Sequence, residues 1–596
     1  MQRVADYVNE FIYKLGVKDI FMVSGGGMMF LSDGLAKHPQ LSAVCTHHEQ
    51  AAAMAAVGYA KMREGFGVVY VTTGCGGTNA VTGLLDAWQD NVPCLFISGQ
   101  CKRKETIRNT GLPLRQLGVQ EVDIIAIVQS ITKYAVMVTD PQKIAWHLDR
   151  AVHLARTGRP GPAWIDIPMD VQGAMIDEEK LERFDPKQET VNYKTEPILD
   201  ELQVLKGLLS NAKRPVIIAG QGIRLAAAVS LFRDFVEKHG IPVVATYLGM
   251  DILPSRHPLF IGRLGTKGDR AGNFAVQNAD LVLAIGSRLS VSSTGHEYAT
   301  FAREAKMVVV DIDPQEHRKN TARIDLFINA DAGCFLKKID LEKSQAWGPW
   351  AQQCREWREK WPICLPEYAV SEKVNMYYFV ERLGLKMKPD AVVISDSGSA
   401  NYVVSQGIQL SGAQRYITAG AQGAMGFTLP AAVGVSVARG HGEVLAITGD
   451  GSFQMNIQEL QTIVHHQLPI KIFIWNNDGY MSIRATQRKF FDKRFIGTDS
   501  CSGISFPDTQ KIAGAYGIPF FKVNQSVELD GVLDKVLAQP GPVICEVMCI
   551  RDQEIVTVAS SRKSDGTMVS RPLEDMYPFL DRKELQANMI VKPLDE

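Results

Sequence analysis

The 596-residue sequence lacks any run of 18 apolar residues, and its first residues, MQRVADYVNEF, are polar and amphipathic. A bilayer-spanning helix needs about 20 apolar residues, and a secretory signal needs an apolar core. The sequence therefore predicts neither a transmembrane helix nor a signal peptide. Its ten cysteines contain no CxxC pair, which is typical of reduced thiols and favours a cytoplasmic protein.

The chain also has little net charge. A formal charge of −1 and a pI near 6.9 predict no general attraction to nucleic acid or to an anionic membrane. Hydrophobic residues make up 46% and charged residues 22%, which is typical of a globular protein with a substantial core. The length alone predicts more than one domain.

Polar residues follow two apolar strand patterns between Ile447 and Tyr480. The pattern LAITGD ends in the turn Gly449–Ser452, a helical pattern covers about 456–466, and the pattern IKIFIW ends in Asn476–Gly479. This is a βαβ unit, so we expect both strand ends to lie side by side at the carboxyl edge of a parallel sheet, where ligands bind.

Asp450 and Asn477 would then meet on one small ion. Their oxygens suit Mg²⁺ but are too few to enclose it, so phosphates would supply the remaining ligands. The start of the next helix, at Gly451 and Ser452, would attract an anion. A structural unit with turn-forming Asp and Asn is the alternative.

The order GDG, then NN, resembles the metal–diphosphate signature of thiamine-diphosphate enzymes. The resemblance implies Mg²⁺ on Asp450, Asn477 and the carbonyl of Gly479, and coenzyme contacts at Gly449, Gly451 and Ser452.

Residues 1 to about 175 alternate between strand and helix patterns, which predicts a parallel α/β layer. Glycine-rich turns at Ser24–Gly27 and Thr73–Asn79 permit close approach of the backbone to a ligand. Between them, Glu49 precedes the small-residue helix AAAMAAVGYA, which must pack closely against its neighbours. Taken alone, capping of the helix N-terminus, favoured by the helix dipole, explains Glu49.

VSGGG, HHEQAAAMAAVGYA and TTGCGGTNAVTGLLDAWQDNVPCLFISGQ together resemble the pyrimidine-binding domain of the acetohydroxyacid synthase (acetolactate synthase) group. The resemblance implies that Glu49 hydrogen-bonds N1′ of the coenzyme's aminopyrimidine. A glutamate shielded from water keeps its proton more readily and can exchange it there. It also implies catalytic positions for Gln120 and Gly26 and a cofactor contact at Asn79. A capping or surface amide is the alternative for Gln120.

A second α/β unit, with strand patterns up to about residue 345, follows a charged linker. Its partial dinucleotide turn at Gly220 is a weak motif alone. The order of its turns resembles the FAD-binding middle domain of acetohydroxyacid synthases. That domain usually carries Asp and Arg where this chain has Ser290 and Ser292, so a groove that is empty or holds ADP remains the alternative to FAD. The positions matching flavin contacts are Arg159, Gly220, Gly222, Thr246, Leu248, Gly262, Gly265, Thr266, Gly286, Arg288, Asp311 and Asp331.

A helix with an aromatic stripe, WGPWAQQCREWREKWP, is predicted before the third α/β unit. The resemblance implies diphosphate contacts from the strand-end turn at Gly398, Ser399 and Ala400. It implies that the carbonyl of Gly423 accepts from the coenzyme's 4′-amino group and that Met425 wedges between the two coenzyme rings. A methionine that only fills the core is the alternative.

The predicted fold is three Rossmann-like α/β domains with central parallel sheets. They are a pyrimidine-binding domain (1–175), a middle domain (192–345) and a diphosphate-binding domain (365–560), with a tail (561–596) as a lid. In the family, the counterparts of Glu49 and Asp450 come from different subunits. The resemblance therefore implies a homodimer or homotetramer with active sites at the subunit interface.

The implied cofactors are thiamine diphosphate, Mg²⁺ and FAD. The implied activity is decarboxylation of a 2-ketoacid, pyruvate, followed by ligation of the acetyl unit to an acceptor carbonyl, as in acetolactate synthase. Val119 and Thr486 replace a Phe and a Trp that narrow the acceptor pocket in the family. Acetyl transfer to a nucleotide-linked keto-sugar or another bulky ketone is therefore a second hypothesis, and a non-catalytic cofactor-holding protein is a third.

Overall fold

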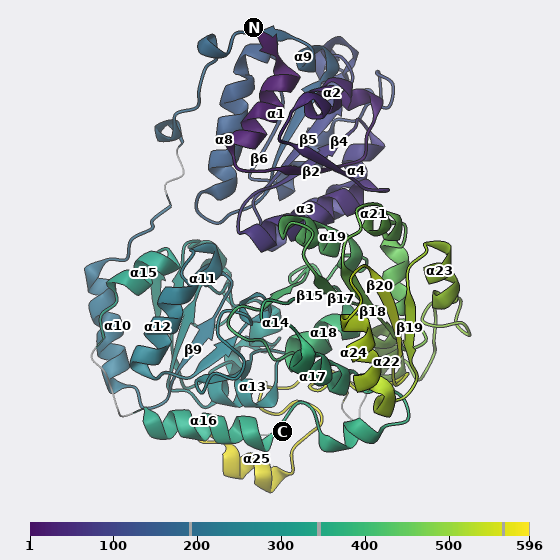
Figure 1. The fold of residues 1–596 in the computed structure, drawn as a ribbon. Helices are drawn as coiled ribbons and strands as arrows, with labels where there is room; N and C mark the ends of the chain where they lie inside the picture. The colour runs from purple at the N-terminus through teal and green to yellow at the C-terminus, as the bar shows by residue number, and fades with distance from the viewer. Residues whose placement is uncertain (190–192, 342–346, 563–566, 595–596) are drawn as a thin grey trace.

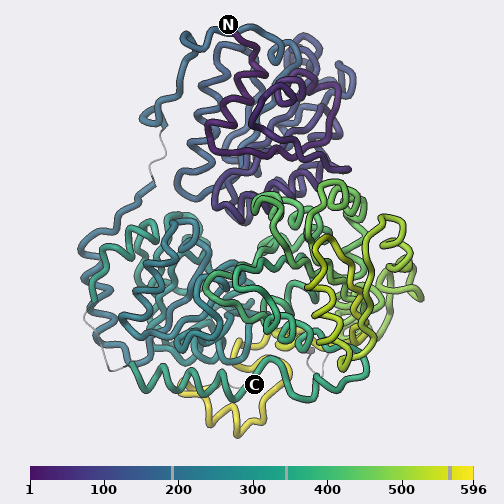
Figure 2. The backbone as a smooth tube through the Cα atoms, in the orientation of Figure 1, coloured from purple at the N-terminus to yellow at the C-terminus, as the bar shows by residue number. Residues whose placement is uncertain are grey.

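The computed structural model describes residues 1–189, 193–341, 347–562 and 567–594 (Figure 1). They form three α/β bodies, each built on a six-stranded parallel sheet, which confirms the predicted fold class. The first body lies above the other two (Figure 2). Within these ranges no helix is both long and apolar enough to cross a bilayer. Residues 192 and 345, the predicted bounds of the middle domain, lie outside the described residues.

The first and third sheets share one strand order. Numbered along the chain within each sheet, the order is 2-1-3-4-6-5 in both. The first sheet contains β2 (Asp19–Met22), β3 (Ser42–Cys45), β4 (Gly67–Val71), β5 (Cys94–Gln100), β6 (Tyr134–Met137) and β7 (Ala163–Pro168). The third contains β15 (Val392–Ser395), β16 (Arg415–Ile417), β17 (Val444–Gly449), β18 (Ile470–Asn476), β19 (Phe520–Val523) and β20 (Val543–Met548).

The middle sheet has the other doubly wound order, 3-2-1-4-5-6. Its strands are β9 (Pro215–Ala219), β10 (Val243–Ala245), β11 (Phe260–Arg263), β12 (Leu281–Ile285), β13 (Lys306–Asp311) and β14 (Leu326–Asn329). They are short and almost entirely buried, as expected for parallel strands covered by helices on both faces.

Each sheet has a point at which the connections that leave two adjacent strands run in opposite directions. It lies between β2 and β4, between β9 and β12, and between β15 and β17. Open α/β sheets bind ligands beyond the carboxyl ends of the strands at this point. The glycine-rich turns singled out in the sequence follow these six strands, so the topology brings them together in pairs.

The first and third bodies meet through two helices of small residues, α3 (Glu49–Arg63) and α19 (Thr428–Ala438). In Figure 1, α3 lies directly over α19. A Cβ added at Gly58 would lie 2.7 Å from the carbonyl oxygen of Ala431, and one at Gly434 would overlap the carbonyl of Ala55. This close approach is the packing that the small-residue pattern predicts, and it joins both bodies in one apolar core.

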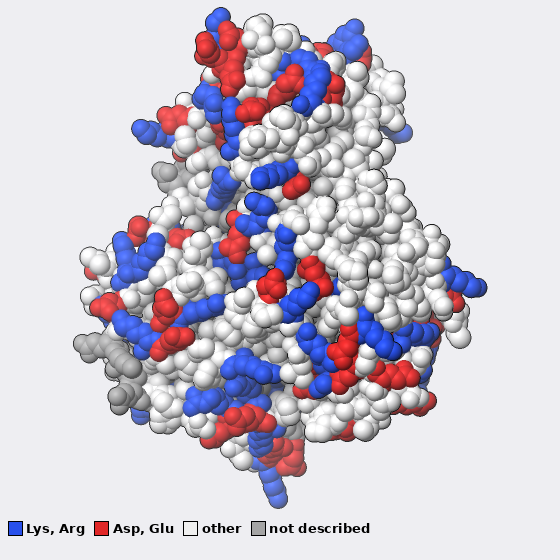
Figure 3. All heavy atoms as spheres, viewed as in Figure 1, with Lys and Arg blue, Asp and Glu red and all other residues white. Residues whose placement is uncertain are grey.

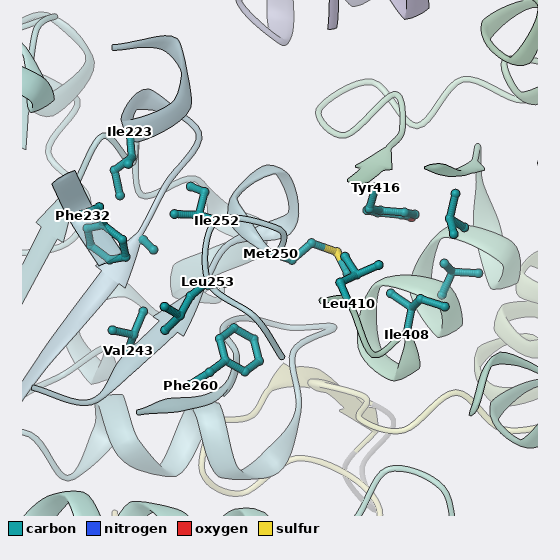
Figure 4. Packing of buried hydrophobic residues seen from close by; sticks show 14 of the residues in the cluster. Ile223, Phe232, Val243, Met250, Ile252, Leu253, Phe260, Ile408, Leu410 and Tyr416 are labelled. Atoms are coloured by element: carbon teal, nitrogen blue, oxygen red, sulfur yellow. The ribbon is translucent and has the colours of Figure 1, made fainter. Parts of the chain in front are cut away.

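The middle and third bodies also share a core. Met250 extends from the middle body toward Leu410 and Tyr416 of the third (Figure 4), and all three belong to one buried cluster. On the outer surface, Lys and Arg are interspersed with Asp and Glu, and the face shown in Figure 3 has no large area of one sign. That distribution agrees with the net charge of −1.

The predicted helix with an aromatic stripe is confirmed as α16 (Gly348–Lys360), with Trp350 and Trp357 buried. Trp357 Nε1 donates to Asn588 Oδ1 at 3.2 Å, which anchors α25 (Arg582–Asn588) beneath α16 (Figure 1). The described part of the tail therefore packs on the middle body, and its role as a lid stays a prediction. Residues 563–566 and 595–596 of that tail lie outside the described ranges.

Candidate active site

Asp450 and Asn477 lie at neighbouring strand ends of the third sheet. Asp450 begins α20 (Asp450–Phe453) after β17, and Asn477 follows β18, the strand paired with β17. The backbone N–H of Gly479 donates to Asp450 Oδ2 at 2.9 Å, which brings the two loops together. Burial raises the pKa of Asp450 to about 6, and a nearby cation would favour its charged form.

The chemistry of this pair fits a magnesium ion. Asn477 Oδ1 is buried and has no hydrogen-bond partner among the described residues, while Asn477 Nδ2 lies 3.7 Å from Met481 Sδ. Buried polar atoms normally have a partner, so this oxygen is available to a ligand. Across the described ranges no group of three or more His, Cys, Asp or Glu side chains could hold a metal. A cation here would therefore take its remaining ligands from backbone and phosphate oxygens.

Asp396 ties the two strand-end turns of this sheet together. Its buried carboxylate accepts from the backbone N–H of Ser397 at 2.7 Å, from Thr448 Oγ1 at 3.1 Å and from Ser452 Oγ at 2.5 Å. The turn leads into α18 (Gly398–Gly407), so Gly398, Ser399 and Ala400 form the start of a ten-residue helix. Free N–H groups at such a start favour an anion. The predicted diphosphate contacts thus lie beside the predicted metal ligands.

The loop expected to hold the coenzyme's pyrimidine end is fixed at its carboxyl end. The N–H of Gly426 donates to Ser452 Oγ at 2.8 Å, and Asn456 Nδ2 donates to the carbonyl of Gly426 at 2.8 Å. Within the loop, Gly423 N–H donates to the carbonyl of Ala419 at 2.7 Å. Met425 is half-buried. The structure therefore brings Gly423 and Met425 next to Ser452 and the GDG turn.

Glu49 is the first residue of α3 and is only 8% exposed. The helix is capped by His48, whose Nδ1 accepts from the N–H of Gln50, so Glu49 is not the capping residue. Glu49 Oε2 accepts instead from Asn79 Nδ2 at 3.0 Å. The two residues predicted as a catalytic acid and a cofactor contact therefore share a hydrogen bond in a largely dry position.

The remaining predicted residues of the first body lie around the same sheet edge. The N–H of Gly27 donates to Thr72 Oγ1 at 3.1 Å, which places the turn containing Gly26 beside the turn after β4. Gly74 has a φ of +67°, and a Cβ there would overlap the carbonyl of Gln120. Gln120 is exposed and Val119 is 85% exposed, so both stand at an open surface of the single chain.

A cavity of about 380 Å³ lies between the middle and third bodies. It extends from the middle-body turns to the loop that carries Gly423. Eight of the predicted flavin positions line it: Arg159, Gly222, Thr246, Leu248, Thr266, Gly286, Arg288 and Asp311. Gly220 packs against Gly286, Gly262 against Asp269, and Gly265 against the carbonyl of Ser292. Asp331 lies elsewhere, where its carboxylate caps α15 (Ala332–Lys338).

The cavity's charges and hydroxyls are those of a polar groove. Arg159 Nη1 lies 2.9 Å from Glu316 Oε2, so this guanidinium already has a partner. The Oγ atoms of Ser290 and Ser292 lie 2.8 Å apart where the related domains carry Asp and Arg. Glycine turns at the place between β9 and β12 where the connections reverse direction are typical of a dinucleotide site. These positions therefore fit a flavin in the groove without the usual ion pair.

Two structural roles were not predicted. Arg484, in α22 (Met481–Phe490), is fully buried and donates to the carbonyls of Asn477 and Asp478, each at 2.8 Å. Asn456 donates to Gln50 Oε1 at 3.1 Å as well as to Gly426. A basic residue seven positions after NN could have been noticed, but no local pattern marks Asn456. The predicted helix over 456–466 is in fact α21 (Glu459–His465), because the preceding turn holds Asn456 against Gly426.

Three family models match the chain in the order of its three sheets. They are the N-terminal TPP binding domain of thiamine pyrophosphate enzymes at residues 2–127, the central domain at 202–339, and the C-terminal TPP binding domain at 396–547. The matches to the N- and C-terminal domains contain Glu49, Asp450 and Asn477.

Relatives from bacteria and plants match nearly the whole chain. The acetolactate synthase large subunit of Lactococcus lactis subsp. lactis (strain IL1403) is 33% identical over 95% of this chain and 96% of its own length. The acetolactate synthase isozyme 2 large subunit of Escherichia coli (strain K12) is 32% identical over 95% and 99%. The chloroplastic acetolactate synthase 1 of Zea mays is 32% identical over 94% and 87%.

Proposed function

The chain belongs to the acetolactate synthase family of thiamine pyrophosphate enzymes, and from that premise we propose which residues and which acceptors its reaction uses. As a member of that family it is a thiamine-diphosphate-dependent enzyme. It decarboxylates pyruvate and joins the acetyl unit to an acceptor carbonyl.

Two groups of residues hold the coenzyme in our proposal. Asp450, Asn477 and the carbonyl of Gly479 bind Mg²⁺, and the helix starts at Gly398 and Gly451 face the diphosphate. When bound, thiamine diphosphate supplies the carbon nucleophile and takes up the electron pair released with carbon dioxide. The observation that supports this arrangement most directly is the buried Asn477 Oδ1, which has no partner in the described part of the chain and lies on the loop tied to Asp450.

Glu49 acts at the other end of the coenzyme. We propose that its carboxyl group holds and exchanges a proton at N1′ of the aminopyrimidine, with Asn79 fixing its orientation. Its low exposure excludes water that would compete for that proton. Gln120 and Gly26 stand at the same sheet edge and would line the approach of the substrates.

The function is tested by incubating the purified protein with Mg²⁺, thiamine diphosphate and pyruvate, alone and with ketones of increasing size. We expect carbon dioxide release and a new carbon–carbon bond in the product, identified by mass. No consumption of pyruvate under any of these conditions would rule out the proposed reaction.

Acetolactate, from a second pyruvate as the acceptor, is our first candidate product. A bulky ketone such as a nucleotide-linked keto-sugar is the second, because four positions lack the large or charged side chains of the family. Val119 and Thr486 are exposed, and the pair Ser290 and Ser292 presents only hydroxyls to the cavity. A yield that rises only with the bulky ketone would favour the second candidate.

We propose that FAD binds in the cavity between the middle and third bodies. Its support is the set of eight predicted positions that line this one cavity beside the coenzyme loop. A visible absorption spectrum of the purified protein, before and after incubation with FAD, tests it. The absence of flavin absorption after incubation and desalting would exclude stable binding.

We also propose a homodimer or a dimer of dimers with active sites shared between subunits. Large apolar side chains are exposed around the predicted site, at Leu117 and Val119 in the first body and at Met455 and Ile483 in the third. Exposed apolar groups that cluster near one site are typical of an interface.

Mixing two inactive variants, Glu49→Gln and Asp450→Ala, tests the shared site. In mixed dimers one of the two sites would be intact, so unfolding and refolding the mixture should restore about a quarter of the wild-type activity. If one chain supplied both residues, no activity would return.

All ten cysteine thiols are free, which supports the further proposal of a cytoplasmic enzyme. Cell fractionation tests it.

A further inference from the structure

The loop that leads to Gly423 is held at its amino end by a carboxylate from the first body. Asp90 lies after helix α5 (Val81–Gln89) and is fully buried. Its Oδ2 accepts from the N–H of Gly420 and its Oδ1 from the N–H of Ala421, each at 2.9 Å. The two oxygens therefore fix two successive peptide groups, only three and two residues before Gly423.

Lys61 completes this contact. Its Nζ donates to Asp90 Oδ2 at 2.7 Å and to the carbonyl of Thr418 at 2.8 Å. Burial alone would lower the pKa of Lys61, but the carboxylates of Asp86 and Asp90 raise it, so the ammonium stays charged. A buried, hydrogen-bonded ion pair loses much free energy when one partner is removed, which makes this contact a rigid one.

The contact connects three parts of the molecule. Lys61 lies 12 residues after Glu49 on the same helix, α3, so the helix spans about 18 Å between them. The carbonyl of Asp90 accepts from Gln221 Nε2 of the middle body at 3.0 Å. The loop that carries Gly423 is thus fixed to α3 of the first body and, through Asp90, to the middle body, and not only to its own sheet.

We propose that Asp90 and Lys61 are positioning residues for the pyrimidine end of the coenzyme. They hold residues 418–421 so that the Gly423 carbonyl and Met425 keep the place that the aminopyrimidine requires. This inference rests on the proposed coenzyme site and adds to it two residues that do not touch the coenzyme. Only the binding of the pyrimidine end should depend on Asp90 and Lys61, because the diphosphate and Mg²⁺ contacts around Asp450 do not involve these two residues.

This difference between the two ends gives the experiment. Asp90→Asn keeps one acceptor oxygen but presents an N–H₂ group to the second loop amide, so one of the two bonds is lost. We expect its Kd for thiamine diphosphate, measured by calorimetry with excess Mg²⁺, to rise about tenfold or more. The Kd for inorganic pyrophosphate, which reaches only the Asp450 end, should stay within about twofold of the wild-type value.

Glu64→Gln is the matched control. Glu64 follows α3 directly and bridges the same three bodies through Arg224 (2.7 Å) and Arg415 (3.2 Å), but among the described residues it does not hydrogen-bond to residues 418–421. Its two Kd values should match those of the wild type. Should Asp90→Asn not fold, the double variant Lys61→Met with Asp90→Asn leaves no unpaired buried charge on these two residues and takes its place in the same titrations.

An unchanged Kd for thiamine diphosphate, or an equal loss of affinity for both ligands, would overturn the inference. An equal loss would show a purely structural role. Hydrogen exchange gives a readout independent of the coenzyme, since the amides of Gly420 and Ala421 should exchange faster in the ligand-free variant than in the wild type. A wild-type protein that binds pyrophosphate but not thiamine diphosphate would instead refute the proposed function, and the exchange result would still stand on its own.

Discussion

Replacing Arg484 by methionine should weaken magnesium binding although the arginine touches no proposed ligand atom. Its guanidinium donates to the carbonyls of Asn477 and Asp478 at 2.8 Å each and to the carbonyl of Arg551 at 2.5 Å. Its Nε also lies 2.8 Å from Asp552 Oδ1. The metal loop is therefore fixed from behind by one buried cation, and methionine removes every one of these donors while keeping most of the volume.

The size of the effect follows from these contacts. Asp552 is 34% exposed and keeps Arg488 at 2.5 Å, so the effect comes mainly from the lost donors to the loop carbonyls and not from this ion pair. Residues that orient metal ligands from behind typically change metal affinity by about 10–100-fold. For Arg484→Met we therefore expect the Mg²⁺ concentration at half-saturation to rise by about 10–100-fold, which corresponds to about 1.4–2.8 kcal/mol.

The assay is a Mg²⁺ titration at fixed thiamine diphosphate, followed by tryptophan fluorescence. Trp475 is fully buried two residues before Asn477, so it reports directly on this loop. Arg488→Met is the matched control, because Arg488 pairs with the same Asp552, one turn further along α22, and within the described part of the chain it does not bond to the loop. Arg484 does not support the metal loop if Arg484→Met binds Mg²⁺ like the wild type, or if Arg488→Met shifts the titration equally.

Three further predictions concern other parts of the molecule. Glu49→Gln should abolish most carbon dioxide release while Mg²⁺-pyrophosphate binding, measured by calorimetry, stays unchanged; wild-type turnover would refute its role. Burial raises the pKa of Asp166 to about 7, so the folded chain holds a proton that the unfolded chain has released, and stability falls as pH rises from about 4 to about 7. In urea denaturation, the free energy of unfolding of Asp166→Asn should increase relative to that of the wild type by up to about 4 kcal/mol across that window. A difference between the two proteins that does not change with pH would contradict the raised pKa. In Gly434→Ala the new methyl group would overlap the carbonyl of Ala55, and we expect the free energy of unfolding to fall by about 3 kcal/mol in the same assay. An unchanged free energy of unfolding would mean that α3 and α19 do not need this close approach.

The sheets and their ligand edges were predictable because their determinants are local. Apolar runs of four to seven residues that end in Gly, Asp or Asn identify strands and their carboxyl ends. Parallel connection by right-handed crossovers then places those ends on one edge without further information. For this reason GDG after β17 and NN at the end of β18 indicated a common site across a gap that contains a whole helix.

The contacts that support the site were not predictable in the same way. Asp90 meets the N–H of Gly420 across 330 positions of the sequence. An Asp at a helix end resembles many ordinary turn residues, and its role depends on how two bodies dock. The same holds for Asn456, whose bond to Gly426 precedes a helix that begins three residues later than the periodicity predicted. Local patterns describe each sheet, whereas the docking of sheets against one another comes from the complete three-dimensional packing.

The cavity between the middle and third bodies gives the middle body a role in the reaction that does not depend on flavin. It is lined both by the flavin-type turns, such as Gly286–Arg288, and by residues 420–423 of the coenzyme loop. A molecule seated in the groove would therefore contact the segment that Asp90 holds. Flavin would stabilise that segment, and an empty groove would leave the stabilisation to Asp90 and Lys61 alone. The effect of Asp90→Asn on thiamine diphosphate binding should consequently be smaller in flavin-saturated protein than in flavin-free protein, because ligands that order the same segment share the cost of ordering it.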